Sequence, residues 1–87
     1  MPYRVEIKRS AQKELAALPK RDRRRVMSAI AGLAANPRPD GARKLVGADD
    51  AYRIRVGDYR IVYQVADRVL VVYVVRVAHR KDVHRGL

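Results

Sequence analysis

The chain has 87 residues, with 20 Lys and Arg against 9 Asp and Glu, which gives a formal net charge of +11. This length fits one small domain and excludes large multi-step enzymes. The absence of cysteine excludes disulfide staples, cysteine-based zinc sites and thiol nucleophiles. The longest apolar run, residues 69–75, is too short to cross a bilayer, and the amino terminus lacks a signal-peptide pattern. We therefore expect a soluble, cytoplasmic protein.

The first half of the chain predicts one strand and two helices. Residues 3–7 alternate apolar and charged side chains, as in a strand with one covered face. Ser10 can cap a helix that runs until Pro19 stops it. Apolar side chains at helical spacing predict a second helix over residues 20–35, and turn formers make residues 36–41 a loop. The two helices are expected to form a hairpin.

The second half of the chain predicts three strands. Residues 52–77 alternate with a period of two, interrupted by a tight turn at residues 57–58 and a second turn at residues 66–68. The expected fold is α+β, in the order β-α-α-β-β-β, with a helical hairpin packed on one face of an antiparallel sheet. A single domain covers residues 1–87, and residues 78–87 form its basic tail.

A two-residue turn at Gly57 and Asp58 determines which side chains share each face of the sheet. Arg55 should lie opposite Arg60, and Arg53 opposite Val62. The face covered by the helices is expected to hold Tyr52, Ile54, Val56, Tyr59, Ile61, Tyr63, Val65, Val69, Val71, Tyr73, Val75 and Val77. The open face is expected to hold Arg53, Arg55, Arg60, Val62, Gln64, Leu70, Val72, Val74 and Arg76.

The arginines of the open face have two interpretations. Like charges directly opposite each other repel, so Arg55 and Arg60 oppose stability. An anion between them would explain their position, and a ribose phosphate is the commonest such anion. Alternatively, the face is solvated, and its charges keep a valine-rich sheet from aggregating.

Two further basic segments admit a similar choice. The tail after residue 78 is by default a solvated arm, although Arg80 should sit near the open end of the sheet. The run at residues 21–25 is either a solvated surface or a contact for RNA or an acidic partner. His79 should point to the covered face if the last strand continues, so we expect it to be structural.

Three stretches together resemble the RelE/ParE toxin superfamily, in particular its RelE-like branch. They are residues 44–47, with Lys44, Leu45 and Gly47, residues 52–63 and residues 77–84. The resemblance covers nearly the whole chain. It implies the toxin of a type II toxin-antitoxin pair. RelE-like members cut mRNA in the ribosomal A site through attack of a ribose 2′-hydroxyl on the adjacent phosphate, with no metal or other cofactor.

The resemblance also implies roles for individual residues. Arg53, Arg55, Arg60 and Arg80 stand at the basic positions that bind the scissile phosphate and stabilise its transition state. Arginine stays protonated and is a poor base, so His84, which stands where many relatives have tyrosine, is the candidate proton acceptor. Nearby arginines should lower the pKa of His84. Residues expected to bind RNA are Lys44, Arg76, Lys81 and Arg85.

The expected partners are a RelB-like antitoxin encoded beside this gene, the ribosome and mRNA. Two other functions remain open. One is a ParE-like toxin, which shares the fold but inhibits DNA gyrase and usually lacks the basic cluster. The other is a catalytically silent module that binds RNA or antitoxin, because arginines stand where many relatives have lysines. The glutamates, Glu6 and Glu14, lie far from the cluster, so the glutamate-assisted chemistry of YoeB-like toxins has no evident counterpart.

Overall fold

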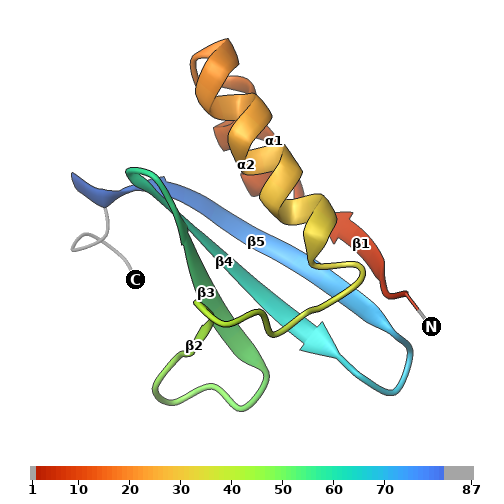
Figure 1. Cartoon of the computed structure of the whole chain (residues 1–87). Helices are drawn as coiled ribbons and strands as arrows, with labels where there is room; N and C mark the ends of the chain where they lie inside the picture. Colours follow the sequence, from red (N-terminus) through yellow and green to blue (C-terminus); the bar gives the residue numbers. More distant parts are fainter. Residues whose placement is uncertain (1, 82–87) are drawn as a thin grey trace.

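The computed structural model describes residues 2–81 and shows a five-stranded sheet with both helices on one face (Figure 1). In chain order the elements are β1 (Arg4–Ile7), α1 (Arg9–Ala16), α2 (Lys20–Gly32), β2 (Arg43–Lys44), β3 (Ala51–Val56), β4 (Tyr59–Ala66) and β5 (Val71–His79). The strand order is β1-β5-β4-β3-β2. β1 runs parallel to β5, and the other pairs are antiparallel. The predicted α+β fold is confirmed. The sheet is mixed and not antiparallel throughout, since β1 is parallel to β5, and the short β2 is an additional strand.

The helix boundaries differ in detail from the prediction. Ser10 does not cap α1, because the helix begins one residue earlier, at Arg9. The Ser10 hydroxyl instead donates to the Val75 carbonyl at 3.1 Å. The cap position belongs to Lys8, whose side chain makes no capping hydrogen bond. Pro19 separates the helices as expected and occupies the extended N-cap of α2. α2 ends at Gly32, earlier than predicted.

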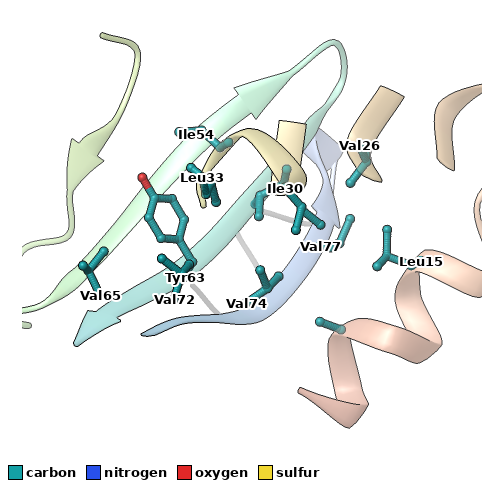
Figure 2. Close-up of a cluster of buried hydrophobic side chains, with 12 residues drawn as sticks. Leu15, Val26, Ile30, Leu33, Ile54, Tyr63, Val65, Val72, Val74 and Val77 are labelled. Carbon is teal, nitrogen blue, oxygen red and sulfur yellow. The ribbon is translucent and has the colours of Figure 1, made fainter. Parts of the chain in front are cut away.

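The core lies between the helices and the covered face of the sheet. Figure 2 shows side chains of α1 and α2 meeting those of β3, β4 and β5. The ring of Tyr63 is fully buried, and its hydroxyl donates to the Pro37 carbonyl at 2.7 Å. Neither helix in the described residues is long and apolar enough to span a membrane. The core residues are Ala11, Leu15, Val26, Ile30, Leu33, Ile54, Ile61, Tyr63, Val65, Val72, Val74 and Val77.

The register of the β3–β4 hairpin is as predicted. Gly57 has a φ of 58° at the first loop position, which suits a type II′ turn. The cross-strand pairs are Val56 with Tyr59, Arg55 with Arg60, and Arg53 with Val62. Two-residue turns match the twist of the strands they join, so this local feature determines the neighbouring pairs.

The predicted turn between β4 and β5 is wrong. The strands are joined by residues 67–70, not by residues 66–68. Leu70 in this turn has a positive φ of 55°. Val69 and Leu70 therefore lie in the turn and not on the sheet faces predicted for them.

This longer turn exchanges the faces of the first half of β5. Val65 lies opposite Val72, three residues later than the predicted turn implies. An odd shift moves every side chain to the other face. Val72 and Val74, predicted on the open face, are buried in the core. Val71 and Tyr73, predicted on the covered face, lie on the open face.

A β-bulge then restores the predicted faces near the end of β5. Residues 62 and 63 pair with Arg76 and Val74, which leaves Val75 as the extra residue. The prediction for Val75 on the covered face was therefore wrong. Beyond the bulge, Arg76 lies on the open face and Val77 on the covered one, as predicted, because the bulge compensates for the odd shift at the turn.

Candidate functional site

A cavity of about 460 Å³ lies where the β3–β4 turn meets the end of β5. It is called the arginine cavity below. Three segments supply its walls: the end of β3 with its turn, the start of β4, and the residues that follow β5. The lining residues are Arg55, Gly57, Asp58, Tyr59, Arg60, Arg80 and Lys81.

The β3–β4 turn positions Arg80 in this cavity. The Arg80 backbone N–H donates to the Asp58 carbonyl at 2.7 Å, which docks the chain after β5 onto the turn. The Arg80 Nε also lies 3.8 Å from Asp58 Oδ1. Both side chains are exposed, so this ion pair contributes little to stability. The tight turn thus holds the tail arginine beside Arg55 and Arg60.

Arg60 has the most unusual environment in the arginine cavity. Its Nε is buried and has no hydrogen-bond partner in the described part of the chain. Burial lowers the pKa of Arg60, and the charges of Arg53 and Arg55 lower it further. A buried donor without a partner is unfavourable. Arg60 also lines the cavity, where an anion would offset the repulsion between the arginines. Phosphate oxygens are strong acceptors for guanidinium groups.

Arg53 lies beside the cavity, on the same open face. It is paired in register with Val62 on one side and with Arg43 of β2 on the other. Lys44 pairs with Tyr52, whose ring packs against the core. Lys44 is therefore on the covered face of the sheet, and not on the open face with Arg53. Arg43 was not among the predicted site residues, because a strand of two residues has no recognisable periodicity. Only its pairing with Arg53, at the edge of β3, would have indicated that it lies on the open face.

Arg76 is engaged at the edge of the sheet. Its Nε and Nη2 lie 3.3 Å and 3.2 Å from Glu14 Oε2 of α1. The other oxygen of Glu14 accepts a hydrogen bond from the Val77 N–H at 2.8 Å. This carboxylate therefore covers the edge of β5 and draws Arg76 away from the arginine cavity. His84 and Arg85 lie outside the described residues, so their predicted roles stay predictions.

A small polar network links α2, β4 and the end of β5 beside the arginine cavity. The Tyr59 hydroxyl donates to Asp22 Oδ2 of α2 at 3.0 Å, and this bond raises the pKa of Tyr59. The Tyr59 ring meets His79 edge-on, with 5.3 Å between the ring centroids. His79 Nδ1 accepts from the Lys81 backbone N–H at 3.1 Å. These contacts give His79 the structural position expected for it. Within residues 2–81, no group of His, Asp and Glu side chains could hold a metal ion.

Known proteins resemble this chain in both sequence and fold. The family model described as the ParE toxin of the type II toxin-antitoxin system parDE matches residues 5–84. Toxin RelG of Mycobacterium tuberculosis is 35% identical, over 98% of this chain and 99% of the relative. The mRNA interferase toxin RelE of Escherichia coli is 34% identical, over 93% of this chain and 86% of the relative.

The crystal structure of the archaeal RelE-RelB complex from Pyrococcus horikoshii aligns with a TM-score of 0.82 and 35% identity, covering 92% of this chain and 97% of that chain. The fold and the matched family model define a toxin of a type II toxin-antitoxin system. The chain belongs to the RelE/ParE toxin superfamily, on its RelE-like branch.

Proposed function

We propose that this toxin is a ribosome-dependent mRNA endonuclease that cuts within the A-site codon. The observation that carries the proposal is the cavity lined by Arg55, Arg60 and Arg80, beside which Arg60 Nε is buried and has no hydrogen-bond partner among residues 2–81. Such a cluster opposes folding unless an anion binds, and the scissile phosphate of mRNA is the anion that the chemistry requires. The E. coli relative is named an mRNA interferase, which supports this reaction class.

In the proposed reaction the ribose 2′-oxygen attacks the adjacent phosphorus, and the bond from phosphorus to the 5′-oxygen breaks. The products are a 2′,3′-cyclic phosphate and a 5′-hydroxyl. Arg55, Arg60 and Arg80 would donate hydrogen bonds to the phosphate oxygens, whose charge increases in the transition state. The proton of the 2′-hydroxyl goes to a base, and the departing 5′-oxygen takes up a proton. We assign the base to His84 because arginine stays protonated.

The ribosome would supply the positioning of the mRNA. Tyr59 is the aromatic residue among the cavity-lining residues, and its ring and hydroxyl are already engaged by His79 and Asp22. Within the part of the chain that the structure describes, the arginine cavity therefore has no free ring on which a base could stack, and such stacking supports the binding of single-stranded RNA. Holding the codon in a fixed geometry lowers the barrier without such a platform.

We also propose a RelB-like antitoxin as the partner. The archaeal relative was crystallised as a complex of RelE with RelB, and a net charge of +11 favours an acidic or amphipathic segment. Such a segment would cover or distort the open face and the arginine cavity. A toxin and antitoxin pair that separates at low salt, where charge attraction is strongest, would contradict this partner.

The test of cleavage is primer extension on programmed ribosomes. Wild type is expected to cut within the A-site codon, and Arg60→Ala to lose these cuts while keeping its fold. Arg68→Ala is the matched control, since Arg68 is exposed in the turn at the other end of β4. Wild-type cuts that persist in Arg60→Ala would remove Arg60 from the site. Absence of cuts from wild type would overturn the proposed activity.

The role of His84 has its own test. His84→Gln should slow single-turnover cleavage at neutral pH more than it weakens ribosome binding, because a base acts on the chemical step. An unchanged single-turnover rate would reject the assignment.

Gyrase inhibition is the second candidate, because the matching family model carries the ParE description. Cell-free translation of a supplied mRNA discriminates the two. A ribosome-directed nuclease stops translation, whereas a gyrase inhibitor leaves it intact and blocks DNA supercoiling. A silent binding module would bind ribosomes or antitoxin and do neither.

A further inference from the structure

A second cationic groove lies on α2, apart from the arginine cavity. It has a volume of about 490 Å³ and is lined by Lys20, Arg21, Arg24 and Arg25. All four side chains are exposed. We call it the basic groove.

The charges of the basic groove oppose the stability of α2. Lys20 and Arg21 lie in the first turn of the helix, where the positive end of the helix dipole disfavours cations. Lys20 with Arg24, and Arg21 with Arg25, are also like-charge pairs four residues apart, which destabilise a helix. Among residues 2–81, none of the four takes part in a salt bridge. Folding alone does not explain this arrangement.

The other two charged residues of this run each bind another element of the fold. Asp22, the acid in the first turn of α2, accepts the hydrogen bond from the Tyr59 hydroxyl. Arg23 donates from Nη1 to the Ala16 carbonyl of α1 at 3.4 Å. The acid is therefore used in holding α2 to β4, and the side chains left at the surface are cations.

The basic groove adjoins the arginine cavity at one point. The guanidinium of Arg25 lies against the β3–β4 turn, where a Cβ added to Gly57 would be 3.2 Å from its Nη1 and 3.4 Å from its Nη2. Gly57 lines the arginine cavity. The two cationic surfaces thus meet at this turn, and a nucleic acid bound in one is adjacent to the other.

We propose that the basic groove binds the phosphate backbone of ribosomal RNA and holds the toxin in the orientation that presents the arginine cavity to mRNA. This inference rests on the proposed function and adds a second RNA contact to it. Arginine side chains bind phosphate oxygens in a bidentate manner, and backbone contacts position a protein without reading sequence. Repeated cations along a helix fit the repeated phosphates of an RNA strand. The groove contributes to affinity and not to the chemical step.

The experiment compares two double variants that remove the same charge. Arg21→Gln with Arg24→Gln changes the basic groove. Arg9→Gln with Lys13→Gln is the control, since both residues are exposed cations four apart on α1. Binding to vacant ribosomes is measured across a salt series, and single-turnover cleavage is measured at saturating ribosomes. Thermal melting checks the fold, and the groove variant should melt no lower than wild type because it loses repulsion.

The groove variant is expected to bind ribosomes about 10-fold more weakly or worse at low salt. Its plot of log K against log salt should be shallower by roughly 1.5, as expected for two lost phosphate contacts. Its saturated cleavage rate should equal that of wild type. The α1 control should keep the wild-type salt slope.

Three results would overturn the proposal. Equal losses in the two double variants would mean that net charge alone matters. A lower saturated cleavage rate with unchanged affinity would assign the groove to the chemical step. Unchanged ribosome binding with weakened antitoxin binding would assign it to an acidic protein. If wild type binds ribosomes but cuts nothing, the nuclease proposal fails while the binding comparison still tests the groove.

Discussion

Arginines at the two ends of β4 have opposite surroundings. At the end of β4 that leads into the turn to β5, Arg38 makes a bidentate ion pair with Asp67, with 2.7 Å between Nη2 and Oδ2. Arg38 Nε donates to the Tyr52 hydroxyl at 2.9 Å, and its guanidinium lies 5.1 Å from the centroid of the Tyr52 ring. Tyr3 donates to the same aspartate at 2.6 Å. Arg38 and Asp67 are therefore fully paired with each other and with two tyrosine hydroxyls.

At the opposite end, Arg60 has cations as neighbours, and its buried Nε has no partner among residues 2–81. The pKa of Arg38 is raised, mainly by its hydrogen bond to Asp67, whereas burial and neighbouring arginines lower the pKa of Arg60. A paired arginine joins segments of the fold, and an unpaired one among like charges is available to a ligand. The difference distinguishes an arginine that holds the fold together from the arginines that we propose to bind RNA.

The largest expected effect comes from replacing one arginine at each end of β4 and comparing the two variants. Arg80→Ala should lower the single-turnover rate of mRNA cleavage about 100-fold, as does loss of a preorganised donor to a developing anion. Arg38→Ala should leave this rate unchanged and lower the free energy of unfolding by about 1 kcal/mol, because its partners are half exposed. Cleavage assays and urea melts of both variants check this. A slow Arg38 variant with unchanged stability would contradict the comparison.

Tyr63→Phe should affect only the paired end. It removes the buried hydrogen bond to the Pro37 carbonyl, next to Arg38, and should cost about 1–2 kcal/mol. The midpoint of thermal unfolding should fall by roughly 5–10 °C for a domain of this size. Single-turnover cleavage well below the new midpoint should match wild type, and a lowered rate there would mean that the two ends are coupled.

Arg55→Gln should make the protein slightly more stable and less active. It removes the charge directly opposite Arg60, so the thermal midpoint at low salt should rise by roughly 1–3 °C. High salt screens the repulsion and should abolish the gain. Melting curves at two salt concentrations, with cleavage assays in parallel, measure both changes. A lower midpoint at low salt would show that Arg55 stabilises the fold.

The smallest effect concerns acid stability at the paired end. The hydrogen bonds from Arg38, and then from Tyr3, hold the pKa of Asp67 below its ordinary value of 3.8. A depressed folded-state pKa gives stability that is present above 3.8 and is lost as the pH falls through the lower folded value. Asp67→Asn should therefore show a shallower loss of stability below about pH 4 than wild type, in urea melts at stepped pH. An unchanged slope would mean that Asp67 titrates alike in both states.

Local features predicted much of the site. The two-residue turn at Gly57 and Asp58 determines its neighbouring pairs, so Arg55 opposite Arg60 followed from alternation alone. Pro19 and the apolar spacing predicted where the helices separate. The resemblance of the chain to RelE-like toxins selected the same arginines, and the fold and family agree with it. The functional roles of these residues stay predictions.

Tertiary packing decided the features that depend on residues distant in sequence. The four-residue turn and the bulge at Val75 reversed and then restored the faces of β5, and no local pattern in a run of valines distinguishes the two registers. Pairing of β2 with β3 brought Arg43 to the open face, and Glu14 drew Arg76 to the edge of β5.

The contact of Arg25 with the Gly57 turn likewise depends on how α2 packs on the sheet. The sequence by itself determined which charges exist and which immediate neighbours they face, because turns and alternation act over a few residues. Only the folded chain decided which arginines find a partner, because pairing depends on segments that packing brings together.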